Sequence, residues 1–246
     1  MKPIRFVLAG LVTLFACTKQ ASPIASISAE NIKPCEVTIV CTVSQPELFT
    51  LPLMKVWMSL DPDKEMTSFL TTNVMKDGKM SLTYPCAYPD TRYYFKVRLF
   101  RGDSVFYDSE EMTFVTADLS SDMVDMGLSV KWAGANLGAR QPQELGTRVT
   151  SLPASLPQRL PTRAEFNELF EKCDVITNTY HNVRGSLFIS RENQNVIFFP
   201  VERITEEAFY WCADEGQALH FMSNGIHKYE ERDDSEGGFI RFVSSK

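Results

Sequence analysis

Alternating apolar and polar residues, broken at short intervals by turn signals, fill residues 25–116. In "EVTIVCTV", Val37, Ile39, Cys41 and Val43 share one face, because successive side chains of a strand point to opposite sides. The segments "KVWMSLD", "SFLTTNV", "KMSLTYP", "RYYFKVRLF" and "MTFVT" continue the pattern, with turns at "KDGK" and "RGDS". Regular short strands without a helical period predict an antiparallel β-sandwich.

One stretch of this half carries a more specific signal. "AYPDTRYYFKV", residues 87–97, resembles the E–F corner and strand F of fibronectin type III domains. The resemblance implies that Tyr93 is the corner tyrosine and that Trp57 is the core tryptophan. For both side chains we expect packing roles. The family's usual leucine before the corner is replaced by Ala87.

Two cysteines stand at ends of predicted strands. Cys35 starts the second strand and Cys86 ends the fifth, and in such a sandwich these ends lie at the same pole. A Cys35–Cys86 disulfide is therefore predicted, with two free thiols as the alternative. Cys41 shares the inward face of its strand and is expected to be a buried free thiol.

The N-terminus has the features of an export signal. Lys2 and Arg5 precede an apolar run over residues 6–15, which is too short to span a bilayer and fits a secretory signal. The run ends in "LFAC", which resembles the lipobox of bacterial lipoproteins. That resemblance implies a signal peptide over residues 1–16, lipidation of Cys17, and a tether over residues 17–24. A plain signal peptide with an incidental Cys17 is the alternative.

A lipidated Cys17 implies a cell-envelope protein anchored to the outer membrane, with the membrane as its partner through the lipid. Thr18, Lys19 and Gln20 follow the cysteine where exported surface lipoproteins of some phyla carry acidic residues, which favours the periplasmic face over the cell surface. The net charge of −6, without a basic stripe, argues against a nucleic-acid partner.

The second half begins after "DLSSD", residues 118–122, the predicted linker. A helix is expected from residue 163, because Thr162 and Glu165 form a capping box. One apolar face of this helix is predicted to hold Phe166, Leu169, Phe170 and Cys173. "GSLFISRENQNVIFFP" is typical of a hairpin, and "FYWCA" and "FIRFV" are predicted strands.

Together these pieces resemble the Fibrobacter succinogenes major paralogous domain. The matching motifs are "VDMGLSVKWA" with Gly138 after it, "RLPTRAE", "VIFFP", "YW" and a terminal "RFV". The resemblance implies a C-type-lectin-like α+β domain over residues 123–246, in which the first and last strands meet. Two departures are the short segment 146–155 and Cys212 in place of the usual serine after "YW"; a Cys173–Cys212 bridge stays open.

The glycine-rich opening "VDMGLSVKWAGANLGA" invites comparison with a phosphate-binding loop. Such a loop usually ends in a Lys-Ser or Lys-Thr pair, but Lys131 is followed by Trp132. We expect Trp132 to anchor the core, and Gly134 and Gly138 to allow close backbone packing.

No catalytic constellation, metal site or cofactor is predicted. The three histidines stand in no motif, and Cys212 near His220 is expected to be a strand neighbour rather than a nucleophile–base pair. Asp233, Asp234 and Glu236, in "EERDDSEGG", form a weak candidate calcium loop, for which a solvated acidic loop is the favoured alternative.

The predicted fold is mixed, with an N-terminal all-β immunoglobulin- or fibronectin-like sandwich over residues 25–117 and the α+β lectin-like domain after it. The predicted function is that of a non-catalytic, lipid-anchored envelope protein that binds a protein or glycan ligand through its C-terminal domain, with the sandwich as spacer. An accessory subunit of a surface fibre and, less favoured, an enzyme acting on envelope polymers are the alternatives.

Overall fold

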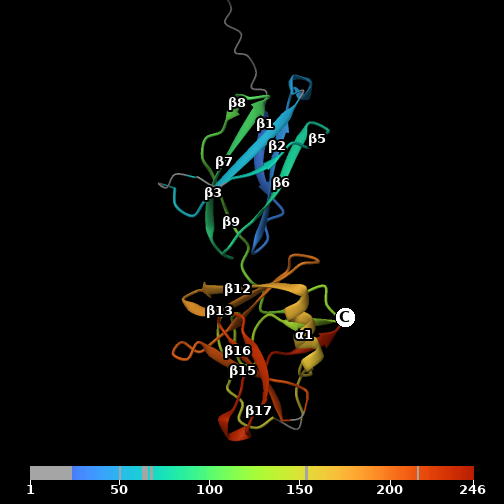
Figure 1. Cartoon of the computed structure of the whole chain (residues 1–246), viewed down its shortest axis with the longest axis vertical. Coiled ribbons are helices and arrows are strands. Elements are labelled where there is room, and N and C mark those ends of the chain that lie inside the picture. The colour runs from blue at the N-terminus through green and yellow to red at the C-terminus, as the bar shows by residue number, and fades with distance from the viewer. Residues whose placement is uncertain (1–23, 50, 63–65, 67–68, 153–154, 215) are drawn as a thin grey trace, which may run out of the picture.

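The computed structural model describes residues 24–49, 51–62, 66, 69–152, 155–214 and 216–246. The fold is mostly β, and its strands form two parts that lie one above the other along the long axis (Figure 1). We call residues 24–117 the sandwich part and residues 123–246 the C-terminal part. The signal segment and Cys17 lie outside the described residues. Within those that are described, no helix has the length and apolar character needed to cross a membrane.

The sandwich part consists of two antiparallel sheets (Figure 1). One has the order β1-β2-β6-β5, and the other has the order β4-β3-β7-β8 with β9 also paired to β7. A 3-10 turn, Pro46–Leu48, follows β2. The strands are β1 Ile24–Glu30, β2 Glu36–Val43, β3 Pro52–Ser59, β4 Phe69–Thr72, β5 Met75–Lys76, β6 Lys79–Pro85, β7 Arg92–Arg101, β8 Ser104–Asp108 and β9 Met112–Val115.

The predicted alternation sets the core of this part. Val37, Ile39 and Cys41 of β2 are fully buried, and they form one cluster with side chains of the opposite sheet such as Val97 and Leu99. Tyr93 is buried in the same cluster, and its hydroxyl accepts a hydrogen bond from the Tyr88 backbone N–H at 3.0 Å. This contact is the tyrosine corner that the sequence predicts. The β-sandwich prediction is confirmed.

The prediction that Trp57 is the core tryptophan is wrong. Trp57 lies on the outer face of β3, half-buried, with the Arg98 guanidinium 5.2 Å from its ring centroid and Phe69 beside it at 5.4 Å. The inward residues of β3 are Met54 and Val56, which alternate with Lys55 and Trp57. Trp57 is therefore not the core tryptophan.

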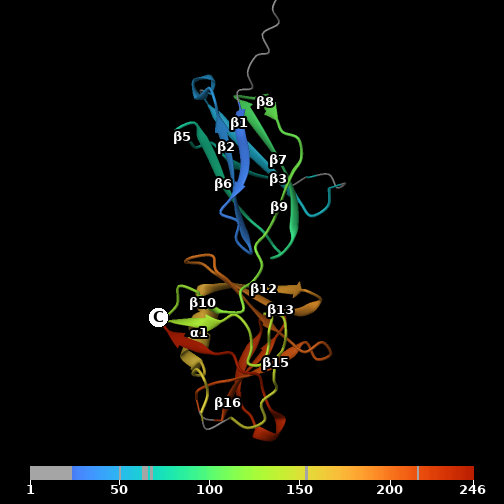
Figure 2. The same ribbon diagram turned by 180° about the vertical axis from the view of Figure 1, so that it is seen from behind.

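The C-terminal part holds three small antiparallel sheets around one helix (Figures 1 and 2). Its first strands pair with the last strand of the chain, in the order β10-β11-β18, which is the meeting of ends that the resemblance implied. The elements are β10 Met123–Asp125, β11 Val130–Ala133, α1 Arg163–Lys172, β12 Cys173–Tyr180, β13 Val183–Ser190, β14 Val196–Pro200, β15 Glu207–Trp211, β16 Gln217–Met222, β17 His227–Glu231, the 3-10 turn Asp234–Glu236 and β18 Val243–Ser245.

The helix begins where its capping box predicts. Thr162 Oγ1 accepts from the Glu165 N–H, and the Glu165 carboxylate accepts from the Thr162 N–H at 2.8 Å. Phe166 and Leu169 are fully buried on the expected face. Strand β12, which follows the helix directly, was not predicted. "FIRFV" was predicted as a strand, but it forms only isolated bridges before β18 begins.

A buried arginine holds the C-terminal part together. Arg241 is fully buried and donates to the Ala133 carbonyl at 2.9 Å and to the Phe198 carbonyl at 2.7 Å. Its guanidinium also lies 4.5 Å from the centre of the Phe199 ring. Desolvation by burial lowers the pKa of Arg241 to about 10. The side chain thus links the end of β11 to β14 through a fully buried guanidinium.

The two parts meet at a seam of side chains from both. Cys35 of the sandwich part and Leu119 of the linker share a buried cluster with Tyr180, Leu187 and other residues of the β12–β14 sheet. Across the same seam, the Asn178 amide donates to the Ala87 carbonyl at 3.0 Å, and the Tyr180 hydroxyl donates to Asp118. The sandwich part is therefore held against the C-terminal part by apolar packing as well as by the linker.

Candidate ligand-binding pocket

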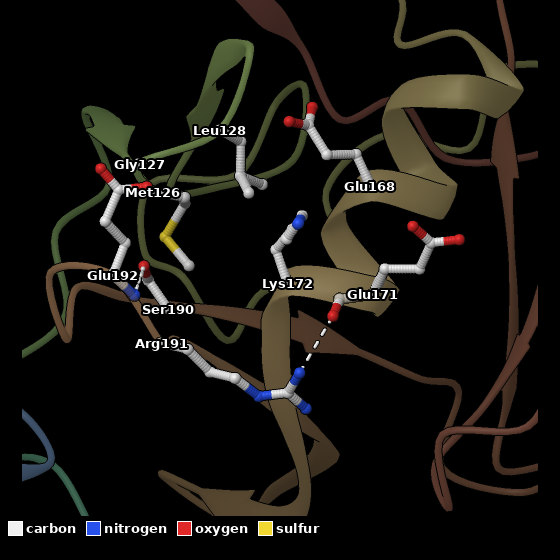
Figure 3. Close-up of a pocket in the computed structure, with 9 residues that line it drawn as sticks. All are labelled: Met126, Gly127, Leu128, Glu168, Glu171, Lys172, Ser190, Arg191 and Glu192. Carbon is white, nitrogen blue, oxygen red and sulfur yellow. Dashed lines mark hydrogen bonds between the residues drawn. The ribbon is translucent and has the colours of Figure 1, made fainter.

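A cavity of about 460 Å³ opens in the C-terminal part, between the β10–β11 turn, helix α1 and the β13–β14 turn (Figure 3). This volume is within the range of small-molecule sites in proteins. Its walls come from three segments of the chain. The lining residues are Met126, Gly127, Leu128, Glu168, Glu171, Lys172, Ser190, Arg191 and Glu192.

The first wall is a tight turn in the opening stretch. Gly127 has φ of +72°, and its N–H donates to Asp125 Oδ1 at 3.0 Å. A Cβ on Gly127 would lie 2.8 Å from the Glu192 carboxylate, so a side chain here would push against the opposite wall. The opening stretch that resembled a domain signature therefore also forms part of a cavity.

The second wall is the polar "RENQN" turn, and it is tied to the first. The side-chain amides of Asn193 and Asn195 both donate to the Asp125 carbonyl, at 2.8 and 2.7 Å. Asn193 also accepts, through Oδ1, from the Asn195 N–H at 3.0 Å. These bonds fix the distance between the two turns and hence the mouth of the cavity.

The third wall is the exposed side of α1. The Glu168 carboxylate accepts from the Ser129 N–H at 3.1 Å and from its hydroxyl, which ties the helix to the opening stretch. Arg191 donates to the Glu171 carbonyl at 3.0 Å, as Figure 3 shows, and to Asp174 at 2.7 Å. Glu168 and Arg191 are thus already engaged in holding the walls.

The remaining charges of the pocket have no partner among the described residues. They are the Lys172 ammonium and the Glu171 and Glu192 carboxylates, at the rim above buried Met126 and Leu128. The ammonium, the carboxylates and the apolar side chains together offer contacts to a small polar molecule that has both donors and acceptors. No histidine or cysteine is among the nine lining residues, and Ser190 Oγ accepts from the Glu192 N–H at 3.2 Å. The lining therefore holds charged and polar groups that can bind a ligand.

The predicted Cys35–Cys86 disulfide is not formed in this structure. Both thiols are free and buried. The two residues are directly opposite each other where β2 and β6 begin and end, and the Cys86 N–H donates to the Cys35 carbonyl at 2.9 Å. Their proximity therefore comes from strand pairing, which holds without a covalent bond. Burial raises the pKa of each thiol to about 12.

Cys173 and Cys212 are also free and buried, within the core around α1. Burial raises the pKa of Cys212 to about 12, which keeps its thiol protonated at neutral pH. The neighbouring His220 stacks on Phe209 at 4.3 Å and lies 3.0 Å from Glu207, on the partner strand. Cys212 and His220 are packing residues here.

The candidate calcium loop gains no support from the described side chains. Asp233 Oδ1 accepts from the Ser235 N–H at 2.8 Å, and this bond lowers the pKa of Asp233. Glu236 lies 3.5 Å from Arg232. The Asp234 side chain lies outside the described residues, so the three-residue loop stays a prediction.

The rim charges Glu171, Lys172 and Glu192 were missed from the sequence. Each stands on a separate segment or on the solvent side of a helix, where charged residues are ordinary. Two sequence features could have indicated the pocket, namely Gly127 in a turn position and the amide-rich "RENQN" turn. Both features indicate that two stretches of backbone lie close together, and neither indicates a binding site.

No protein-family model and no curated protein matches this sequence. Among solved structures, the chicken interferon gamma receptor alpha chain is similar at 13% identity over 39% of this chain and 50% of that one, with a TM-score of 0.33. A human fibronectin type III domain, derived from the KIAA0970 protein, is similar at 18% identity over 42% of this chain and 80% of that one, with a TM-score of 0.31. The sensor domain of the anti-sigma factor RsgI4 in Pseudobacteroides cellulosolvens is similar at 21% identity over 41% and 94%, with a TM-score of 0.28.

This chain therefore spans half of the receptor chain it resembles. Identities and TM-scores this low assign no family and transfer no function.

Proposed function

We propose that this chain is a non-catalytic, lipid-anchored protein of the cell envelope that binds a small polar ligand, such as a glycan, through its C-terminal part. The observation that carries the proposal is the pocket in Figure 3, with unpartnered charges at its rim. The "LFAC" motif at Cys17 supports the anchor, which we place at the outer membrane with the periplasmic face favoured.

The sandwich part acts as the spacer in this proposal. It lies between the N-terminal segment and the C-terminal part, and the buried cluster around Leu119 packs it against the β12–β14 sheet. A packed seam restricts the movement of the two parts more than a free linker does, so the pocket is held at a set distance from the anchor.

We further propose that the C-terminal part is a major paralogous domain with a C-type-lectin-like α+β fold, over residues 123–246. The pairing of β11 with β18 and the buried Arg241 of the "RFV" motif support this assignment. Close packing at the signature glycine agrees with it, because a Cβ on Gly138 would lie 2.2 Å from Thr147 Oγ1.

The binding proposal is tested with an array of envelope glycans and peptidoglycan fragments, probed with the full chain in detergent. We expect at least one immobilised glycan to be bound, and the double change Lys172→Ala with Glu192→Gln to weaken that binding at least about tenfold, since one lost charge-assisted hydrogen bond accounts for such a factor. The matched control is Lys96→Ala with Glu110→Gln, two exposed residues of the sandwich part. An array without any bound glycan contradicts the proposal, and capture of a fibre subunit instead supports the assembly alternative.

The anchoring proposal is tested by palmitate labelling of the wild type and of Cys17→Ala, with protease accessibility on intact cells. We expect label on the wild type alone and protection of the chain from added protease. Equal labelling of both forms contradicts lipidation at Cys17, and degradation on intact cells places the chain on the surface.

A further inference from the structure

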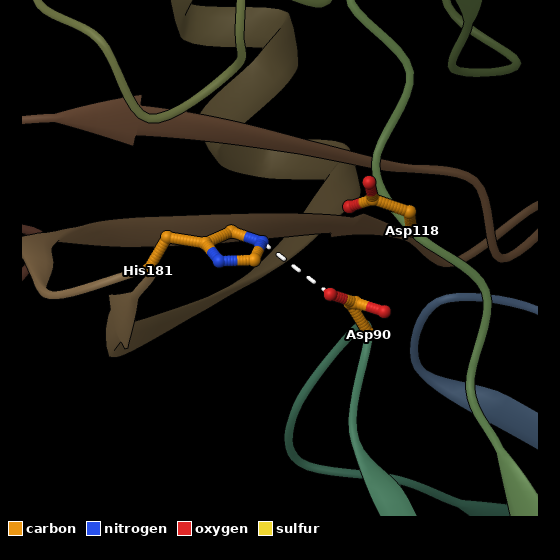
Figure 4. A group of neighbouring side chains, drawn as sticks. All are labelled: Asp90, Asp118 and His181. Carbon is orange, nitrogen blue, oxygen red and sulfur yellow. Dashed lines mark ion pairs between the residues drawn. The ribbon is translucent and has the colours of Figure 1, made fainter.

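Three metal-ligating side chains from three different segments meet at the seam between the two parts (Figure 4). Asp90 lies in the loop before β7, Asp118 lies in the linker, and His181 lies in the β12–β13 turn. One ligand atom of each lies within 4.8 Å of the other two, and they are the only such group of three among the described residues. His181 Nε2 lies 3.6 Å from Asp90 Oδ2.

The chemistry of this group fits a divalent transition metal. One imidazole nitrogen and two carboxylates are common ligands of Zn²⁺, which leaves a fourth position for water. Tetrahedral zinc with bonds of about 2.0–2.2 Å places its ligand atoms roughly 3.3 Å apart, so the three groups must draw together by at most about 1.5 Å. All three side chains are exposed and lie in loops, so rotamer changes can supply this movement.

Asp118 is already oriented by hydrogen bonds to one of its oxygens. Its Oδ1 accepts from the Leu119 N–H at 2.7 Å and from the Tyr180 hydroxyl. Its Oδ2 has no hydrogen-bond partner among the described residues. Carboxylates that bind metals are commonly held in this way, with the second oxygen fixed by neighbouring donors.

A second observation at the same place is independent of the carboxylates. Asn178 is 6% exposed and lines a cavity of about 160 Å³ together with Asp90 and His181. Its amide nitrogen donates to the Ala87 carbonyl, but its Oδ1 is buried and has no hydrogen-bond partner. A buried oxygen without a donor costs about 1–3 kcal/mol, and a water in the cavity that donates to it would offset this cost.

We propose that Asp90, Asp118 and His181 bind one Zn²⁺, and that Asn178 Oδ1 accepts a hydrogen bond from the water at the fourth position. The metal joins the sandwich part, the linker and the C-terminal part, because each contributes one ligand. It therefore fixes the orientation of the two parts, in addition to the apolar cluster around Leu119. This site lies apart from the pocket in Figure 3, so it stands or falls separately from the ligand-binding proposal.

The test is isothermal titration of Zn²⁺ into the full chain in detergent, with a non-chelating phosphine as reductant. We expect one Zn²⁺ per chain, and we expect Asp90→Asn and His181→Asn each to weaken binding at least tenfold. Asparagine suits both positions, because Asp90 has φ of 43° and His181 has φ of 46°, and asparagine tolerates this region. The matched controls are Asp103→Asn and His227→Asn, which remove the same groups elsewhere and should retain the wild-type affinity.

A second measurement separates a site at the seam from zinc held by other groups. Hydrogen exchange at residues 178–183 should slow when Zn²⁺ is added to the wild type and to the controls, and should not change in His181→Asn. A wild-type chain without a one-to-one binding event overturns the proposal. So does an affinity that is the same in the wild type and in the Asp90→Asn, His181→Asn double variant.

Discussion

The sandwich part and the C-terminal part are stabilised by different means. The core of the sandwich part is apolar and is set by strand parity, and its buried polar side chains among the described residues are Ser109 and Thr116. The C-terminal part buries many more polar groups in the same described set: Asn136, Asn178, Ser186, Ser190, His220, Ser223 and Arg241. Its three sheets are short, so side-chain hydrogen bonds satisfy backbone carbonyls that no neighbouring strand reaches.

This difference predicts which substitutions lower the stability of the chain most. A sandwich strand tolerates a new side chain on its outer face, because its hydrogen bonds run between backbones. In the C-terminal part the Arg241 side chain satisfies two buried backbone carbonyls, and its removal leaves both without that partner. Matched substitutions in the two parts test this contrast.

The largest contrast is expected for two tryptophans. Trp132→Ala should lower the local free energy of opening by about 3–5 kcal/mol, because it removes a fully buried ring packed on Phe166. Trp57→Ala should cost about 1 kcal/mol, since Trp57 loses mainly its contact with the Arg98 guanidinium on the outer face. Hydrogen exchange of peptides from β11 and β3 measures both values, and equal losses in the two parts would contradict the burial pattern.

Two arginines give the next contrast. Arg241→Ala should destabilise the C-terminal part by about 3 kcal/mol, because the buried carbonyls of Ala133 and Phe198 lose their donors. Arg98→Ala removes an exposed pair with Asp108 and the contact with the Trp57 ring, and should cost about 1 kcal/mol. The same hydrogen-exchange measurement gives the loss of stability for each of the two variants. A loss under about 1 kcal/mol for Arg241→Ala would show that relief from burying the charge offsets the lost bonds.

The smallest effect per group is expected for each buried thiol, as a fall in stability at alkaline pH. Burial raises the pKa of the Cys35, Cys86, Cys173 and Cys212 thiols from 9.0 to about 12, and that of Cys41 to about 11. The folded chain keeps these thiols protonated while the unfolded chain ionises above pH 9, so their contribution is complete below pH 9 and is lost as the pH rises toward 12.

Each buried thiol should remove on the order of 1 kcal/mol of stability at about pH 10, with three thiols in the sandwich part and two in the C-terminal part. Urea unfolding in a reducing buffer at about pH 8 and pH 10 measures the fall. In Cys41→Ala the difference between the two pH values should be smaller than in the wild type by about 1 kcal/mol. An unchanged difference would show that Cys41 ionises as readily in the folded chain as in the unfolded one.

Strand positions followed from the sequence where one face is buried and the other is not. Strands β2 and β6 cover the predicted segments "EVTIVCTV" and "KMSLTYP", with Cys35 and Cys86 one residue outside them, because alternation marks both their face and their register. Trp57 was assigned to the core by family resemblance, although it alternates with the charged Lys55 and so belongs on the outer face. For Trp57, the alternation of side chains along the strand predicts the observed face, and the family resemblance does not.

Strand β12 could not be predicted, because its pattern is polar at Asn178 and Thr179 and its pairing depends on β13, which follows it. "FIRFV" has the composition of a strand, but its backbone hydrogen bonds go to three separate segments, around residues 133–137, 159 and 209–211. Composition alone therefore predicted a regular strand that does not form. The pocket and the seam group each combine side chains from three segments, and only the folded chain brings such segments together.

The central claim is that the C-terminal part binds and the sandwich part positions it. The most direct measurement is hydrogen exchange of the full chain with and without the glycan that binds most strongly on the array. We predict slower exchange at residues 127–129 and in helix α1, with the sandwich part unchanged. Protection confined to residues 24–117 would contradict the claim, because the sandwich part would then be the binding surface.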